Sequence, residues 1–184
     1  MSACRANKYH PALVVLHWTL AWFILASLAF GFLVLAPLPN TDARKLDMLQ
    51  WHMGLGMAIL AAMGVRALVR WRSARPAPAG VGTPTSARAA GGAHLAFYGL
   101  VGAMVATGYA TALNAGLDEV VFARSGAPLP PRFDAYPSFV AHGWIATMLA
   151  VLIALHVAGA LWHGLVRRDG VMRRMGVGGR RVDY

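Results

Sequence analysis

An uninterrupted apolar stretch near the C-terminal end, AHGWIATMLAVLIALHVAGALWHG, is long enough to cross a bilayer as a helix and contains three histidines. A helix turns about 100° per residue, so His142, His156 and His163 fall on one face. At a rise of about 1.5 Å per residue, His142 and His156 lie about 21 Å apart along the axis. Polar side chains at such depths are costly unless they face the protein interior and have a partner. The stretch therefore predicts two sites at two depths, completed by residues from other helices.

The composition of the 184-residue chain is that of a membrane protein. Hydrophobic residues make up 58% of the sequence and charged residues only 13%, which is too little polar surface to cover a soluble globule. The net charge is +10, but the basic residues lie beside the apolar spans, as orientation signals do, so no nucleic-acid partner is expected. Because Cys4 is the only cysteine, an intrachain disulfide and a thiolate metal cluster are excluded.

Four apolar spans predict an all-α membrane protein, a bundle of four transmembrane helices, at about residues 12–36, 48–69, 93–113 and 141–166. The first span follows a short basic tail, as in a signal peptide, but it is too long for one and prolines follow it, so we expect a retained helix. Residues 71–91, rich in Pro, Gly and Ala, predict a mobile loop. Residues 114–139 predict a longer loop with a short surface helix around 117–122.

The distribution of basic residues predicts the orientation of the bundle. Thirteen Lys and Arg residues lie in the N-terminal tail, the 66–91 segment and the C-terminal tail, against four in loops 37–47 and 114–139. The positive-inside rule therefore predicts cytoplasmic N and C termini, with these two loops outside.

This topology pairs four histidines by depth. His17 and His156 lie in the cytoplasmic halves of the first and fourth spans, whereas His52 and His142 lie near the outer ends of the second and fourth. Two bis-histidine sites about 20 Å apart favour two haem b groups, each with its iron held axially by one pair. Zinc is the chemical competitor, although a structural zinc site needs four clustered donors. Purely structural histidines are the remaining alternative.

Further residues are candidates for binding roles. Gly54 and Gly56 follow His52 and either leave room for a flat macrocycle or allow close helix packing. Arg66, on the face of His52, either pairs with a haem propionate or extends to the membrane interface.

Each end of the bundle also has candidate residues for electron entry or exit. On the outer side, Arg44 and Lys45 are candidates to attract an anionic donor, with ordinary solvated charges as the alternative. On the inner side, His163 is a candidate ligand, or else an exposed residue at the end of its helix. Trp162 either lines the same pocket or anchors the helix at the interface.

Three segments resemble a known family. They are NKYHPALVVLHW, WHMGLGMAILAAMGVRALVRW and AHGWIATMLAVLIALHVAGALWHGLVRRDGVMRRM, and they are similar to segments of bacterial cytochrome b561, the small four-helix dihaem proteins of the bacterial plasma membrane. The resemblance covers nearly the whole chain, which we expect to form one domain over residues 1–184, and is weakest in loop 114–139. It implies b-type haems on His17, His52, His142 and His156, and electron exchange with the quinone pool. With that acceptor, His163 is the candidate quinone ligand, and Trp162 a candidate for the wall of its pocket. Members often have adjacent histidines where this chain has Trp162 and His163.

Two functions follow from this resemblance. Members similar to superoxide oxidases pass an electron from periplasmic superoxide to ubiquinone, which makes superoxide and ubiquinone the expected substrates of an oxidoreductase. The alternative is a non-catalytic cytochrome b anchor, which passes electrons between a soluble dehydrogenase or hydrogenase partner and the quinone pool. The sequence has no fused partner domain that would decide between them.

Overall fold

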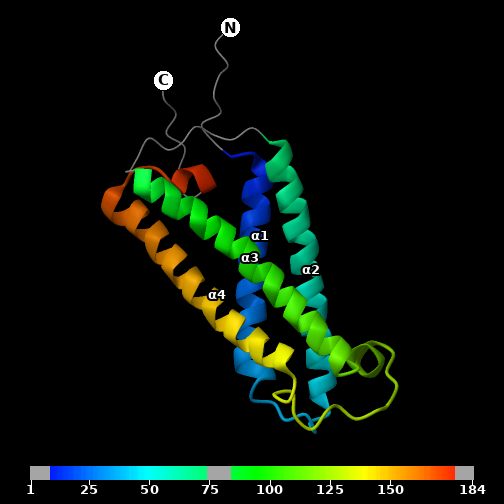
Figure 1. Ribbon diagram of the computed structural model, residues 1–184. Helices are drawn as coiled ribbons and strands as arrows, with labels where there is room; N and C mark the ends of the chain where they lie inside the picture. The colour runs from blue at the N-terminus through cyan, green and yellow to red at the C-terminus, as the bar shows by residue number, and fades with distance from the viewer. Residues whose placement is uncertain (1–8, 74–83, 177–184) are drawn as a thin grey trace.

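Four long helices form the described part of the protein (Figure 1). The computed structural model describes residues 9–73 and 84–176, although not the side chains of residues 84–90. The helices are α1 (Pro11–Phe30), α2 (Arg44–Arg72), α3 (Pro84–Asn114) and α4 (Pro137–Leu161). Wide π-helical turns extend α1 (η1, Gly31–Leu35) and α4 (η3, Trp162–Arg167). Each of the four contains a segment long and apolar enough to cross a membrane, which confirms the predicted four-span all-α fold.

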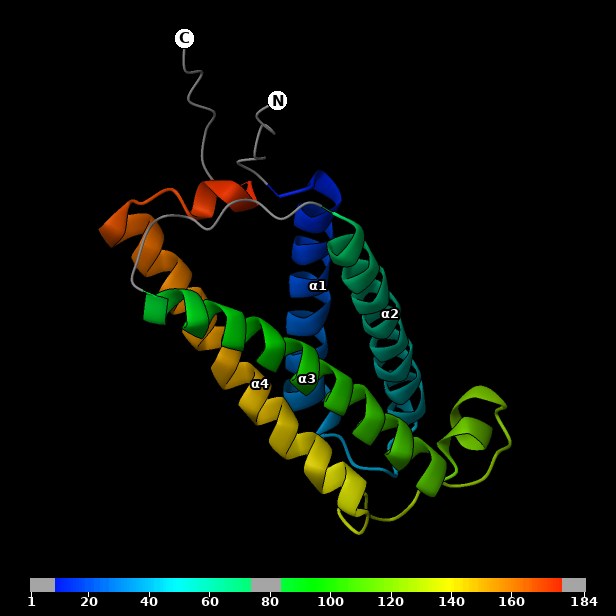
Figure 2. The same ribbon diagram turned by 45° about the horizontal axis from the view of Figure 1, so that its top comes forward.

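The helices pack as two pairs, α1 with α2 and α3 with α4 (Figures 1 and 2). The first residues of α1 and α3 and the last turns of α2 and α4 lie at one end of the bundle, here called the His163 end. The other end, here called the loop end, carries the connections from α1 to α2 and from α3 to α4.

Two exposed tryptophans on α2 have the spacing of the two boundaries of a membrane. On α2, Trp51 and Trp71 are both exposed and 20 residues apart, which is about 30 Å along a helix. That spacing equals the thickness of the hydrocarbon layer, and amphipathic rings favour its two boundaries.

The loop end is covered by its own polypeptide. The short π-helix η2 (Asp118–Phe122) lies where the surface helix was predicted, and its Val121 is fully buried. Leu117 and Phe133 are buried beside it, and the cluster packs against Leu46 and other residues near the start of α2. Residues 115–136, here called the outer cap, are therefore anchored at the loop end by these buried side chains, whereas residues 122–128 are exposed.

The helices α2, α3 and α4 begin before the predicted starts of their apolar spans, and part of the predicted loop is not described. The helix α3 begins at Pro84, whereas the apolar pattern placed its start at about residue 93. The additional turns contain alanines, which favour helix, and start with a proline, which is tolerated in a first turn. Residues 74–83 of the predicted mobile loop, and Cys4, lie outside the described residues.

Candidate functional site

The structure brings the four predicted histidines together in two pairs. The rings of His17 on α1 and His156 on α4 have centroids 6.3 Å apart, with planes inclined by 67°. The rings of His52 on α2 and His142 on α4 have centroids 6.2 Å apart, with planes inclined by 77°. These are the pairs that depth alone predicted, and each joins α4 to the α1–α2 half of the bundle.

An apolar layer separates the two pairs. Each long helix contributes one buried side chain to it: Leu20, Ile59, Val101 and Leu149. On α4 the contributor lies seven residues from each ligand candidate, midway between the two depths. The bundle therefore contains two polar levels separated by a layer of apolar side chains.

His142 is held in a defined orientation by α3. Its Nδ1 lies 3.0 Å from the carbonyl oxygen of Met104 and 3.2 Å from Oγ1 of Thr107. A carbonyl oxygen can only accept, so the imidazole proton is on Nδ1 and Nε2 has a free lone pair. Gly108 makes this approach possible, because a Cβ atom there would lie 3.2 Å from Cε1 of the ring. Metal-binding histidines are typically oriented by such an acceptor behind the ring.

His52, the opposite member of the pair, has a polar atom without a partner. Its Nδ1 is buried and makes no hydrogen bond within the described part of the chain. Phe30 stacks on the ring at 6.5 Å, and a Cβ at Gly31 would lie 3.6 Å from its Cε1. A buried imidazole without a hydrogen bond is costly, so a bound group that uses this ring would offset the cost.

The His17–His156 pair has an aromatic and a cationic neighbourhood. Trp18 and Phe97 contact the two rings edge-on, with centroid distances of 5.4 and 5.3 Å. The charge of Arg66 acts on His17, and His94 on α3 acts on both histidines. Arg66 therefore lies at the level of this pair, as expected for a partner of a haem propionate. The guanidinium of Arg66 favours an anionic substituent on whatever the pair holds.

The geometry of the two pairs fits haem iron. With a metal–nitrogen bond of about 2 Å and a centroid about 1.1 Å behind the nitrogen, two axial imidazoles have centroids about 6.2 Å apart. Both observed separations agree with this value. Within the described residues, no group of three or more His, Cys, Asp or Glu side chains is placed to hold a metal ion, so the histidines stand as pairs.

The glycines after His52 do not serve close helix packing. A Cβ atom added at Gly54 or Gly56 would meet no atom of another element within 4 Å. Space is therefore open beside α2 at this level, as the interpretation in terms of a flat macrocycle expects.

The basic residues of the loop end are not free surface charges. Arg44 pairs with Asp42 at 2.8 Å, Arg124 with Asp47 at 2.8 Å, and Arg132 with Asp134 at 2.5 Å. Hydrogen bonds from Arg44 lower the pKa of the Asp42 carboxyl to about 2, so this pair is neutral overall at pH 7. Compensated charges attract an anion only weakly.

Lys45 differs most from its expected setting. Only 5% of the residue is exposed, and its Nζ donates to the carbonyl oxygens of Leu35 and Leu38 at 2.6 and 2.7 Å. Those oxygens belong to the end of η1 and the turn after it, where helical carbonyls lack hydrogen-bond donors. The expectation that Lys45 and Arg44 attract an anionic donor therefore loses its structural basis, because one is buried and the other is paired.

His163 is engaged at the opposite end. Its Nδ1 lies 2.5 Å from Oδ2 of Asp169, and 31% of its side chain is exposed. Trp162, its neighbour in η3, is largely exposed, which suits an interfacial anchor at least as well as a pocket wall.

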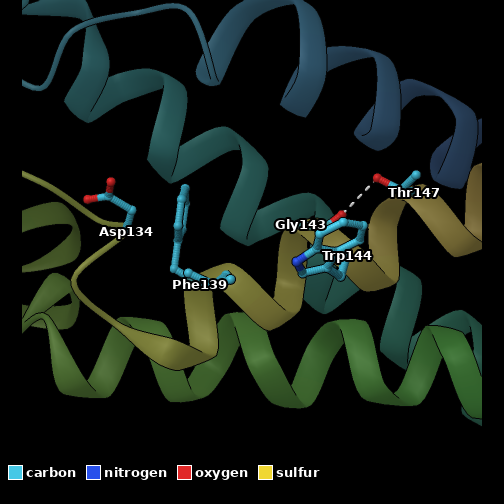
Figure 3. A pocket seen from close by; sticks show the side chains of 6 residues that line it. Asp134, Phe139, Gly143, Trp144 and Thr147 are labelled. Atoms are coloured by element: carbon cyan, nitrogen blue, oxygen red, sulfur yellow. Dashed lines mark hydrogen bonds between the residues drawn. The ribbon is translucent and has the colours of Figure 1, made fainter.

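A hollow of about 270 Å³ opens on α4 near the loop end (Figure 3). Figure 3 shows Phe139, Trp144 and Thr147 around it, with Asp134 at its edge; Val140 and Gly143 complete the lining. At about 100° per residue, the lining residues that belong to α4 lie on average roughly 130° around the helix from His142. The hollow therefore opens on another face of α4 and is separate from the His52–His142 pair.

Several residues around the pairs were not predicted. Phe30, Phe97 and Met104 carry no signal in an apolar span, because any large side chain there is equally compatible with core packing. Thr107 carried a usable signal, since a hydroxyl in the middle of an apolar helix needs an acceptor.

Comparisons with known proteins agree with this geometry. The family model of prokaryotic cytochrome b561 matches residues 8–178. Cytochrome b561 homolog 2 of Escherichia coli (strain K12) is 27% identical over 172 residues, which are 92% of this chain and 91% of that protein. The chain belongs to the prokaryotic cytochrome b561 family, membrane proteins that transfer electrons with b-type haem.

Proposed function

We propose that the protein binds two haem b groups and transfers electrons across the bacterial plasma membrane, from superoxide at the loop end to ubiquinone at the His163 end. One observation carries the proposal: two histidine pairs, each with the centroid separation of a bis-imidazole iron site, lie on either side of an apolar layer. Bound haem would supply the one-electron chemistry.

The chain's own residues have separate roles in this proposal. His52 and His142 hold the group near the loop end, and His17 and His156 the other. Met104 keeps the Nε2 lone pair of His142 available by accepting from its Nδ1. Arg66 neutralises a propionate at the level of His17.

The orientation rests on charge. The His163 end carries the larger number of basic residues, so the positive-inside rule places it, with both termini, in the cytoplasm. Quinone is then reduced where protons are taken from the cytoplasm, and His163 at that end is the proposed ligand for a quinone carbonyl, with Trp162 beside it.

Superoxide as donor is supported by the closure of the loop end. The outer cap packs on α2, and Arg124 fixes it by donating to Asp47 and Gln50 at 2.8 Å each. A small donor needs no docking surface there. Since the four basic side chains are paired or buried, its approach depends little on ionic strength.

Single histidine substitutions test the haem assignment. His17→Ala or His156→Ala should remove mainly the inner haem, and His52→Ala or His142→Ala mainly the outer one, as measured by the pyridine haemochrome assay and redox titration. His10→Ala is the matched control, because His10 lies at the start of α1, outside both pairs, and should leave two haems per chain. Parent protein that contains no haem, or zinc in its place, would end the assignment.

Reconstitution tests the reaction. Liposomes containing only this protein and ubiquinone should form ubiquinol when superoxide is supplied. Absence of that activity, together with copurification of a large soluble redox subunit, would instead establish the membrane-anchor function.

A further inference from the structure

The contact between His163 and Asp169 is a built site. One carboxylate oxygen, Oδ2, lies 2.5 Å from Nδ1 of His163, and the other, Oδ1, accepts the backbone N–H of Val171 at 3.3 Å. Only 7% of the Asp169 side chain is exposed, against 31% of the imidazole. A buried carboxylate with both oxygens engaged thus lies behind a ring whose other side reaches the surface.

The backbone around Asp169 is shaped to make this contact. After η3, Arg168 has φ 49° and Gly170 has φ 80°, so two left-handed residues turn the chain back over α4. Met172 then packs against Gly164. A Cβ atom added at Gly164 would lie 3.2 Å from Cγ of Met172. A left-handed arginine is unfavourable, so the packing that follows must hold the turn.

The returning segment is also attached to the helix that carries His17. Trp18 on α1 donates from Nε1 to the carbonyl oxygen of Met175 at 3.1 Å. Gly176 lies beside Val14 of α1, because a Cβ atom added at Gly176 would be 3.5 Å from Cγ1 of Val14. The 3-10 turn η4 (Met172–Met175) therefore links α4 to α1 beside the inner histidine pair. This attachment fixes Asp169 relative to His163.

We propose that His163 and Asp169 form the proton-transfer site for quinone reduction, with Asp169 as a positioning residue. The proposal rests on the quinone site proposed above. Because the carboxylate accepts from Nδ1–H, it selects the orientation in which Nε2 faces outward. Nε2 is then the atom that donates to a quinone carbonyl oxygen, and the ionised carboxylate stabilises the protonated ring before the transfer.

The chemistry balances with quinone as the oxidant. Reduction of a quinone to a quinol takes two electrons and two protons, one proton for each oxygen. As an oxygen gains electron density, the Nε2–H bond breaks and an O–H bond forms, which leaves a neutral imidazole still donating from Nδ1. Water at the exposed edge then returns a proton to Nε2. The proton for the other quinone oxygen, on the far side of the ring, comes from water at the membrane surface. The carboxylate remains ionised throughout.

Groups close to the carboxylate favour that ionised state. Hydrogen bonding from His163, and to a lesser extent the charge of Arg167, lowers the pKa of the Asp169 carboxyl. Arg168 is turned away to donate to the carbonyl of Leu165 at 3.2 Å, and the guanidinium of Arg173 lies beside Gly170. On the neighbouring helix α1, the titratable residues are His17 and, at its N-cap, His10.

The test compares Asp169→Asn with the parent as purified, haem-loaded protein. After reduction, each is mixed with a short-chain ubiquinone, and reoxidation is followed by stopped-flow absorbance from pH 5.5 to 9, a range chosen about the ordinary pKa of histidine. Asp169→Asn should retain both haems but reoxidise about tenfold or more slowly. The pH at which the rate falls should move lower, because the ring loses the charge that stabilises its protonated form. Asp169→Glu should recover part of the rate.

Asp134→Asn is the matched control, since it removes an aspartate that also pairs with a basic side chain but at the loop end. Parental rate and pH profile in Asp169→Asn would overturn the proposal. A slower rate with an unshifted profile would also overturn it, because that result describes a structural contact only. If His163→Ala itself reoxidises at the parental rate, the quinone site is elsewhere and the proposed function loses that part. If His163→Ala is slow and Asp169→Asn is not, only the role of Asp169 fails.

Discussion

Replacing Gly108 by alanine should weaken haem binding at the His52–His142 pair while leaving the other pair intact. The added Cβ would lie 3.2 Å from Cε1 and 3.4 Å from Nδ1 of His142. Ordinary contacts of this kind are longer, so the ring must move by a few tenths of an ångström. That movement is directed away from α3, which carries the carbonyl of Met104 that accepts from Nδ1 at 3.0 Å.

The expected size of the effect follows from the role of that hydrogen bond. Loss of an acceptor behind a metal-binding histidine typically lowers metal affinity about 10- to 100-fold. The substitution only lengthens the bond, so we expect the lower limit, about tenfold. Gly99→Ala is the control on the same helix, because a Cβ there meets no atom within 4 Å. Both alanines raise helix propensity by about 1 kcal/mol, so a general loss of stability is not expected.

Titration of haem into the haem-free forms of both variants, with the Soret band followed, measures the two affinities. Gly108→Ala should show one site of parental affinity and one weakened site, and Gly99→Ala two parental sites. Parental affinity at both sites of Gly108→Ala would refute the reasoning that α3 orients His142. Equal weakening in both variants would refute it as well, since crowding at the ring would then not be the cause.

Two further predictions concern the loop end. Lys45→Met keeps the aliphatic stem but removes the charged donor from the carbonyls of Leu35 and Leu38. It should lower the free energy of unfolding by about 2–4 kcal/mol, measured by thermal unfolding in detergent. An unchanged unfolding midpoint would contradict this. The pKa of Asp42 is lowered to about 2 by hydrogen bonds from Arg44, so the Asp42–Arg44 contact contributes stability above the unfolded pKa of about 3.9 and loses it as the pH falls towards 2. The difference in melting temperature between parent and Asp42→Asn should therefore shrink below pH 4, and a constant difference would contradict the linkage.

The helices and the pairing of the histidines were predictable because both depend on period and depth alone. An apolar span has one way to satisfy its backbone in a bilayer, which is to form a helix. Once four spans alternate in direction, the depth of each histidine follows from its distance to the end of its span. No contact had to be known, which is why His17 and His156, or His52 and His142, could be matched across large separations in sequence.

What the sequence could not show depends on how the chain turns between helices. Lys45 has the sequence context of a solvated charge, and its burial arises because the turn after η1 presents two carbonyls to it. Asp169 lies only six residues from His163, yet the contact needs Arg168 in a left-handed conformation that residue type does not predict. Local propensities describe helices well, but such turns are set by the packing on either side of them.

The two ends of the bundle differ in a way that supports the proposed direction of electron flow. At the loop end the outer cap is packed on α2, its basic residues are paired with aspartates, and Lys45 is used to cap η1. A donor that gives up a single electron and exchanges no proton with the protein needs nothing more there. At the His163 end, the part-exposed imidazole of His163 is held against the buried carboxylate of Asp169. An electron acceptor that also takes up protons requires such a proton donor. The proposed assignment, with one-electron donation at the loop end and proton-coupled reduction at the His163 end, therefore gives each set of side chains a use.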